Sequence, residues 1–441
     1  MRRSQATLFK HDVEGAAATS SASRPGAPPE QFKLSSDRLH VERTVRGRDG
    51  SCHATRTALS AMPRSTRLTQ DQLAAMNDLA FLRATTWPST PHDSAPLRSA
   101  DLFSGCGIMS LGLWEACRAL GRLLEPVVAL DIDTTALSVY KQNFPNASVQ
   151  SEPIETILDA PLGSPPSSRE REFLSTVGHI DVLVGGPPCQ GHSNLNNHTR
   201  RDDPKNRLYE RMARFAELVK PTHVICENVS AVLHDKGHVV EKTATCLRAL
   251  GYTVSQGVVD VASLGVPQRR RRHVLVASLV HKPDVPTMLA SYTREERSVA
   301  WAIKDLMSTK PLRSFDTPGV ANKVNQKRVD YLFRWDKHEL PDRLRPDCHR
   351  LKAHSYKSVY GRMYWDEPAQ TITSGFTCMG QGRYVHPKLR RTLTPHEAAR
   401  LQFIPDFFQF SDDVPRTMLA NIIGNAVPAK LTYALALELL R

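Results

Sequence analysis

The stretch ADLFSGCGIMSLGL, residues 100–113, joins a short apolar run, a glycine turn and a segment with helical apolar spacing. Gly105 and Gly107 let the backbone turn tightly and approach a ligand closely. A strand, a tight turn and a helix in this order start a βαβ unit. Gly-x-Gly alone is a weak signal, because an ordinary turn between a strand and a helix has the same form.

Four further apolar runs alternate with helical patterns and indicate the fold class. They are PVVAL at 126–130, DVLVGG at 181–186, THVICEN at 222–228 and HVLVASLV at 273–280. The alternation predicts an α/β fold with a parallel sheet covered by helices. Ligands of such folds lie beyond the carboxyl ends of the strands, so the residues that follow each run form the candidate site.

The composition indicates a basic protein of more than one domain. The chain has 441 residues and a formal net charge of +13, which favours a nucleic-acid partner, although a merely basic protein has the same balance. Its eight cysteines include no C-x-x-C pair, so we expect neither a metal site nor a disulfide scaffold. Because the chain shows no signal peptide and no apolar run of about 18 residues, we expect a cytoplasmic protein without membrane contact.

The N-terminal residues predict little regular structure. Residues 1–66 are rich in Ala, Ser, Arg and Pro and lack periodic apolar spacing, so we predict a flexible tail that can be deleted without loss of chemistry. Residues 67–98 are predicted to form a helical extension and a linker. The helical spacing runs from Leu68 to Arg83, with Thr69 as a suitable N-cap.

The second apolar run leads into Asp131-Ile132-Asp133. An acidic residue at this place, 26 positions beyond Gly105, suits hydrogen bonds to a ribose diol. A helix N-cap is the alternative role of either aspartate. Together with the glycine turn, the pattern indicates a nucleoside cofactor.

The third run leads into Gly185-Gly186-Pro187-Pro188-Cys189. The glycines permit a tight exit and the prolines restrict the backbone beside the thiol, which suits a nucleophile that must meet its target at one angle. A free cysteine is otherwise a small buried apolar residue. Polar residues suited to an exposed loop follow this one, so we expect Cys189 to be reactive.

The last two runs place charged residues beside the site. Glu227 stands at the end of the fourth run, where desolvation would raise its pKa and let it share or donate a proton, unless it caps a helix. Four arginines precede the fifth run. In an extended segment Arg270 and Arg272 point to one side, where they would bind an anion or a base carbonyl. A solvated charge run is the alternative.

Six segments, in chain order, closely resemble the successive motifs of the bacterial-type DNA (cytosine-5)-methyltransferases: DLFSGCG, GGPPCQGHS, ENV, QRRRR, RRTLTPHEAARLQFIP and GNAVPAK. The resemblance covers residues 99–280 and 388–441, with a supporting pattern in 356–388. It implies a Rossmann-like S-adenosylmethionine-dependent methyltransferase domain that begins at 99–280 and is completed by 388–441. Residues 281–387 would form a smaller, inserted target-recognition domain.

The resemblance also implies the reaction and its catalytic residues. Cys189 would add to carbon 6 of a cytosine turned out of the DNA helix, and carbon 5 would then take the methyl group of S-adenosylmethionine. Glu227 would contact ring nitrogen 3 and the exocyclic amine. Arg270 and Arg272 would orient the base.

For the cofactor pocket the resemblance implies nine residues by their motif positions. They are Phe103, Gly105, Gly107, Asp131, Ile132, Glu152, Pro188, Leu208 and Asn425. Ile132 stands where the family often has a bulkier, sometimes aromatic residue against the adenine. Glu152 is matched to the acid at the adenine amine, although SEPIETI departs from the usual Gly-Asp-Ile form.

DNA contacts are expected from two segments. Gln381 and Arg383, in a glycine-containing stretch, would reach base edges in the major groove. Arg200 and Arg201 lie in a segment that resembles the family's mobile loop, and they would contact phosphate, with simple solvation as the alternative.

The expected partner is duplex DNA, bound by a monomer at the nucleoid, and a cognate restriction endonuclease would act separately. A tRNA methyltransferase of the same family is the first alternative, although the long basic segment 281–387 favours duplex DNA. A catalytically silent DNA-binding relative is the second, and it would not need Cys189. A cysteine hydrolase is disfavoured because no histidine is clearly placed as its base.

Overall fold

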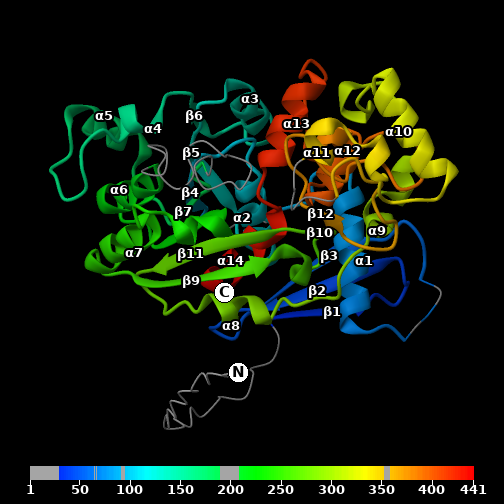
Figure 1. Cartoon of the computed structure of the whole chain (residues 1–441). Coiled ribbons are helices and arrows are strands. Elements are labelled where there is room, and N and C mark those ends of the chain that lie inside the picture. The colour runs from blue at the N-terminus through cyan, green and yellow to red at the C-terminus, as the bar shows by residue number, and fades with distance from the viewer. Residues whose placement is uncertain (1–28, 64, 66, 91–94, 189–207, 352–357) are drawn as a thin grey trace, which may run out of the picture.

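The computed structural model describes residues 29–63, 65, 67–90, 95–188, 208–351 and 358–441 (Figure 1). Within these residues a seven-stranded sheet has the strand order β6-β5-β4-β7-β8-β11-β9. Its strands are β4 (Leu97–Leu102), β5 (Leu124–Leu130), β6 (Ser148–Gln150), β7 (Val182–Gly185), β8 (His223–Val229), β9 (Thr253–Asp260) and β11 (Arg271–Ser278).

The sheet is mixed rather than wholly parallel. The five strands β4 to β8 pair in parallel, whereas β11 runs antiparallel to both β8 and β9. The predicted α/β fold is confirmed, but the prediction of a parallel strand at 273–280 was wrong. The chain passes from β9 to β11 through the short helix η3 (Val261–Leu264) and β10 (Gln268–Arg269), and an antiparallel neighbour needs no crossover helix.

Alternate residues of the central strands face two apolar clusters, one on each side of the sheet. In β7, Val182 and Val184 join the first cluster and Leu183 joins the second. The first lies under α2 (Ile108–Ala119), α3 (Thr134–Asn143) and α14 (Ala429–Leu440). The second lies under α4 (Ile154–Ile157), α5 (Ser168–Val177), α6 (Glu210–Val219) and α7 (Val239–Ala249), with η2 (Ser230–His234) after β8. The sheet is therefore buried on both faces.

Helix α14 lies directly against α2, the helix that follows the first strand of the sheet. At this crossing, a Cβ atom on Gly112 would come within 2.3 Å of the backbone oxygen of Ala429. Only glycine allows such a close approach. The chain thus returns to the α/β domain through α12 (Pro395–Leu401), α13 (Arg416–Asn425) and α14.

Residues 30–58 form a three-stranded antiparallel sheet, so the prediction of a flexible tail over 1–66 was wrong for this part. Its strands are β1 (Glu30–Leu34), β2 (His40–Arg46) and β3 (Cys52–Ala58). Alternate residues of β2 are buried, and one of the three buried side chains is Arg43. The helix α1 (Gln70–Arg83) packs against this sheet and begins with the predicted N-cap Thr69, which forms a capping box with Gln72.

Arg43 joins the N-terminal sheet to the two crossing helices. Its Nη2 atom lies 2.7 Å from Oε1 of Glu115 in α2, and its Nη1 atom donates to the hydroxyl of Tyr433 in α14 at 3.0 Å. Tyr433 donates in turn to Glu30 of β1, and Arg118 forms a two-bond pair with Glu115. These charges are buried together, so the sheet is part of the domain packing, and deletion of residues 1–66 would remove the partners of Glu115 and Tyr433 in it.

The chain between β11 and α12 divides between two cores. The helices α8 (Val285–Ala290) and α9 (Val299–Ile303) contribute to the first large cluster, so the predicted domain boundary at 281 comes too early. A separate small core comprises Val329, Leu332, Leu340, Met379 and Val385, and we call residues 314–387 the small lobe. Figure 1 shows this lobe, with α10 and α11, beside the large sheet.

The small lobe contains little sheet in its described residues. The short helix η4 (Lys304–Ser308) precedes the lobe. The elements of the lobe itself are η5 (Ser314–Asp316), α10 (Lys323–Arg334), η6 (Asp342–Leu344), α11 (Asp347–Arg350), β12 (Ala369–Gln370) and η7 (Met379–Gln381). The two-residue strand β12 pairs with β10 of the α/β domain. Within the described residues of 361–387, the sheet is limited to β12 and isolated bridges at Arg362 and Val385.

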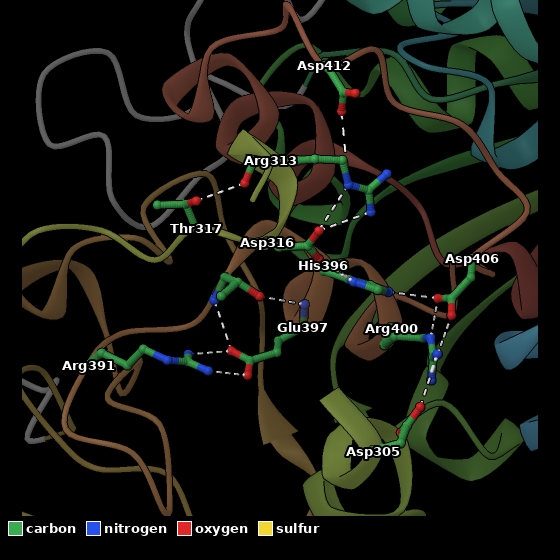
Figure 2. Close-up of polar contacts among 11 residues, drawn as sticks. Asp305, Arg313, Asp316, Thr317, Arg391, His396, Glu397, Arg400, Asp406 and Asp412 are labelled. Carbon is green, nitrogen blue, oxygen red and sulfur yellow. Dashed lines mark hydrogen bonds and ion pairs between the residues drawn. The ribbon is translucent and has the colours of Figure 1, made fainter. Parts of the chain in front are cut away.

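Charged side chains of α12 tie the small lobe to the α/β domain (Figure 2). His396 Nδ1 lies 2.8 Å from Oδ1 of Asp316 in η5, and its Nε2 lies 2.9 Å from Oδ1 of Asp406. Arg400 pairs with Asp406, and Glu397 accepts two hydrogen bonds from Arg391 at 2.7 Å. Both ring nitrogens of His396 face carboxylates, so this geometry requires the doubly protonated imidazolium.

We expect Arg43→Ala to lower the free energy of unfolding by about 1.5–3 kcal/mol, because the buried Glu115 would keep only Arg118, and the buried Glu30 only Arg294 and Tyr433, as partners. The matched control is Arg56→Ala in β3 of the same sheet, whose exposed ion pairs with Asp37 and Glu42 contribute little. Urea unfolding of both variants measures the difference. Equal losses would contradict the role given to Arg43.

The stability that His396 contributes should depend on pH. Burial alone lowers the pKa of His396, but the hydrogen bonds to Asp316 and Asp406 outweigh it and raise the pKa above its ordinary value. The contribution is therefore complete below the pKa of an unfolded histidine and is lost as the pH rises through the raised folded pKa. We expect His396→Asn to cost about 1–3 kcal/mol at pH 6 and less at pH 9. Urea unfolding at both values checks this, and a cost that does not change with pH would refute it.

Candidate active site

The turn between β4 and α2 leaves its backbone open to a ligand. Phe103, Gly105 and Gly107 have positive φ angles of 58°, 51° and 93°. A Cβ atom on Gly105 would meet no heavy atom within 4 Å, whereas one on Gly107 would come within 2.8 Å of the Tyr140 ring. Gly107 is also the N-cap of α2 and supplies no capping side chain, so the N–H groups of this helix end are available to an anion.

A buried polar chain that the sequence did not reveal supports this turn. Asp101 in β4 accepts a hydrogen bond from Oγ of Ser110 at 2.7 Å, and Ser110 Oγ lies 2.9 Å from the hydroxyl of Tyr140 in α3. Burial raises the pKa of Asp101 to about 7. These hydrogen bonds hold α2 and α3 against β4, so the Phe103–Gly107 turn has a rigid base.

The two aspartates after β5 have different roles. Asp133 is the N-cap of α3 and accepts from the N–H groups of Thr135 and Ala136. Asp131 accepts from the N–H of Gly105 at 2.8 Å and from the N–H of Asp133 at 2.9 Å. It thereby joins the two loops, and its carboxylate oxygens keep further lone pairs for a ribose hydroxyl.

The remaining predicted cofactor residues border these loops. Ile132 is 69% exposed and offers an apolar surface next to Asp131. Glu152 follows β6, the neighbour of β5, and its exposed carboxylate pairs with Arg169. Leu208 packs, as Phe103 does, against the second apolar cluster.

Pro188 and Asn425 lie near the exit of β7, at the carboxyl end of that strand. Pro188 is the last described residue before the gap, two residues after Gly186. Asn425 is the exposed last residue of α13. Val427, just after it, would lie 3.8 Å from a Cβ atom on Gly186, so the turn with Asn425 lies beside the exit of β7.

Glu227 is buried at the carboxyl end of β8 beside the exit of β7. Its Oε2 atom would lie 3.6 Å from a Cβ atom on Gly186, and Arg272 Nε lies 2.8 Å from its Oε1. The neighbouring Asn228 donates from Nδ2 to the backbone oxygen of Pro187 at 3.2 Å. The structure thus joins the strand that carries Glu227 to the diproline segment that leads to Cys189.

The surroundings of Glu227 shift the pKa of its carboxyl group upward. Burial raises the pKa of this carboxyl group, and the nearby Arg272 and Arg270 offset only part of the increase. A protonated carboxyl group has an O–H that can donate a hydrogen bond, and its other oxygen can accept one. Glu227 can therefore both donate and accept toward a bound base.

The arginines of 269–272 alternate between two sides, as expected. Arg269 and Arg271 are exposed, and Arg269 pairs with Glu296. Arg270 is buried, and its Nη1 atom donates to the backbone oxygens of Ile372 at 2.8 Å and Gly424 at 3.4 Å. Arg272 contacts Glu227 directly, whereas Arg270 joins the strand to two other segments of the chain.

The structure does not support Arg383 as a reader of bases. Its side chain is buried, and it donates to the backbone oxygen of His338 at 2.8 Å and to Oε1 of Glu339 at 2.7 Å. It also lies over the ring of Tyr364. That prediction was wrong because an arginine beside glycines was taken to be exposed. Gln381 is exposed, with its side chain next to Gly375.

Three predicted residues, Cys189, Arg200 and Arg201, lie outside the described residues. Among the residues that the structure does describe, no group of three or more His, Cys, Asp or Glu side chains is placed to hold a metal ion. In the same residues no helix is long and apolar enough to cross a membrane.

A family model for the C-5 cytosine-specific DNA methylases matches residues 97–441. The chain belongs to this family. It is a DNA (cytosine-5)-methyltransferase, and S-adenosylmethionine is its methyl donor.

Individual relatives agree with this assignment. The chain is 46% identical over 374 residues to type II methyltransferase M1.BsuMI of Bacillus subtilis (strain 168), and this alignment covers 85% of this chain and 87% of the relative. It is 30% identical to type II methylase M.HgiDII of Herpetosiphon aurantiacus, over 77% of this chain and 94% of the relative. The solved structure of S. pombe Dnmt2 methyltransferase matches 79% of this chain and 100% of its own with a TM-score of 0.54, and at 20% identity this shows the fold alone.

The described residues of the methyltransferase fit its cofactor. The open backbone at Gly105 and the N-terminus of α2 suit a carboxylate, Asp131 suits the ribose hydroxyls, and Ile132 offers an apolar surface for the adenine. The bound sulfonium supplies an electrophilic methyl group, and these residues would bind and orient it.

The raised pKa of Glu227 predicts a pH effect on methyl transfer. The rate of a single turnover should fall as the pH rises through this pKa, because the carboxyl group then loses the proton that it donates. Glu227→Gln should lower the rate by about 10²–10⁴-fold and abolish this decline. Transfer of a labelled methyl group to DNA between pH 5 and 9 measures both effects. The control is Glu241→Gln, an exposed partner of Arg248, and a decline that persists in Glu227→Gln would contradict the assignment.

Proposed function

We propose that this methyltransferase modifies carbon 5 of cytosine in one short sequence of duplex DNA through a covalent adduct with Cys189. The observation that carries the proposal is the buried Glu227–Arg272 pair beside Gly186, at the base of the segment that leads to Cys189. A buried carboxyl group whose pKa is raised at this place suits the ring nitrogen of a cytosine. The neighbouring cofactor loops would bring the methyl donor to the same strand edge.

The proposed reaction begins with attack of the Cys189 thiolate on carbon 6, which forms the S–C bond. Glu227 donates a proton to ring nitrogen 3 and accepts a hydrogen bond from the exocyclic amine, so the negative charge from the attack is neutralised. Carbon 5 becomes an enamine carbon and takes the methyl group from the sulfonium. Methyl transfer releases S-adenosylhomocysteine. Water then takes the proton from carbon 5, the ring double bond re-forms as the Cys189 thiolate leaves, and ring nitrogen 3 returns its proton to Glu227.

Addition above the ring plane requires a base that has left the helix stack, so the substrate cytosine must be flipped out of the duplex. Arg272 would keep Glu227 oriented toward the flipped base, since its Nε atom holds one carboxylate oxygen. Arg270 would support the same strand through its contacts with Ile372 and Gly424.

Duplex DNA is the proposed partner for two reasons. The net charge of +13 favours binding to a phosphate backbone, and both relatives above are named type II enzymes. We therefore place the enzyme in a restriction-modification pair, with a separate endonuclease that cuts the same sequence. It would act as a monomer at the nucleoid in the cytoplasm, and the small lobe would read the sequence, with Gln381, Arg200 and Arg201 as DNA-contact residues.

We expect Cys189→Ser to bind DNA and to lose methyl transfer, because a hydroxyl is a much weaker nucleophile than a thiolate. The measurement is bisulfite sequencing of plasmid DNA from a methylation-free host that expresses the enzyme. Protected cytosines in one short context should occur with the wild type and with the control Cys52→Ser, an exposed cysteine of β3.

Two outcomes would contradict the proposal. Normal protection in Cys189→Ser would remove this residue as the nucleophile. No protection with folded wild-type protein would favour a tRNA substrate or a catalytically silent relative, and methyl transfer to tRNA distinguishes these two.

A further inference from the structure

Two buried glutamines form a hydrogen-bonded chain behind the site. Gln268 in β10 and Gln402, the C-cap residue of α12, are both fully buried. Gln268 accepts from the N–H of Ile372 at 3.0 Å and donates from Nε2 to Oε1 of Gln402 at 2.6 Å. The same Nε2 donates to the backbone oxygen of Leu401 at 2.9 Å.

Gln402 continues the chain to the end of α13. Its Nε2 atom donates to the backbone oxygen of Ile423 at 2.8 Å and lies 3.4 Å from that of Gly424 and 3.3 Å from that of Ala426. These carbonyls surround Asn425, the proposed cofactor residue at the last position of α13. The last carbonyls of a helix have no partner within it, so Gln402 satisfies groups that would otherwise be buried without one.

Arg270 connects the same two segments along a second path. It donates to the backbone oxygens of Ile372 and Gly424. The segments also touch directly, since a Cβ atom on Gly424 would come within 2.1 Å of the backbone nitrogen of Ser374. Tyr384 donates to the backbone oxygen of Thr371 at 2.9 Å and adds another contact to the segment with Ile372 and Ser374.

The position of Asn425 therefore depends on atoms that lie outside the cofactor pocket. α12 itself is held by His396 and Glu397 near its start and by Arg400 near its end (Figure 2), so Gln402 extends from a fixed support. An amide is the side chain that can accept from one partner and donate to the next, which both positions require. Neither a carboxylate nor an apolar side chain can do both.

We propose that Gln268 and Gln402 are positioning residues for cofactor binding. They hold the turn with Asn425 in place relative to Arg270 and Arg272 at the start of β11. Gln268 thus acts on the cofactor pocket through Gln402 and Asn425, without contact with the cofactor. The proposal rests on the role of Asn425 given above.

The test is a double-mutant cycle with S-adenosylhomocysteine as the probe, measured by titration calorimetry on the full chain. Gln268→Met removes the hydrogen bonds to Ile372, Leu401 and Gln402 and should weaken binding about tenfold in the wild-type background, because the turn with Asn425 loses support. In the Asn425→Ala background it should have no further effect, because the residue through which it acts is absent. Gln402→Glu, which keeps the acceptor and loses the donor, should behave in the same way. The control is Gln370→Met, an exposed position of β12.

Equal weakening by Gln268→Met in both backgrounds would overturn the proposal, because a general loss of structure acts whether or not Asn425 is present. No weakening in the wild-type background would overturn it as well. If Gln268→Met does not fold, Gln268→Glu enters the same cycle under the same criteria. The cycle needs no DNA, so its failure is distinct from a failure of the bisulfite experiment, which tests the cytosine chemistry.

Discussion

The contact between α2 and α14 is the constraint on which the rest of the structure depends. The chain leaves the α/β domain after α9 and returns to it through α12, so the two parts must be joined by packing. Gly112 lets the helices approach until backbone meets backbone, at a place where any Cβ atom would collide with Ala429. Because α2 starts at the glycine turn and α14 follows the turn with Asn425, this single crossing sets the distance between the two halves of the cofactor pocket.

Buried charge in this protein is arranged in two ways with different purposes. Where segments are joined, the charges are paired: Arg43 with Glu115, and Arg400 with Asp406. Where chemistry is proposed, burial dominates instead, and the pKa of Glu227 stays raised despite the two arginines nearby. Buried carboxyl groups thus connect segments of the chain in one place, whereas Glu227 is the proposed proton donor in another. The balance between desolvation and ion pairing determines the pKa of each group.

Local patterns allowed much of the site to be predicted from the sequence. The strand ends, the capping Thr69 and the glycine turn depend on neighbouring residues, and Asp131 meets Gly105 because parallel strands end at one edge. The N-terminal sheet was missed because its partners Glu115 and Tyr433 are distant in the chain. In addition, the buried residue Arg43 interrupts the alternation of apolar and polar residues that would have indicated the strand β2. β9 was missed because TVSQGVVD reads as a polar segment, and without it β11 was taken to be parallel.

Buried polar residues were the hardest to predict. Nothing in the local sequence distinguishes Gln268, Gln402 or Asp101 from exposed residues of the same type, since their partners come from other segments. Arg383 was misjudged for the same reason. Hydrogen-bond partners of this kind follow from the completed fold rather than from spacing.

The buried link between β1 and α14 has a consequence for how the protein is made. Glu30 is among the first described residues to leave the ribosome, but its partner Tyr433 follows 403 positions later. Until then the N-terminal sheet lacks the surface that neutralises and covers its inner face. Domain-by-domain folding during synthesis cannot complete this molecule, and an unfinished chain would expose the buried charges of Glu30 and Arg43 to chaperones and proteases.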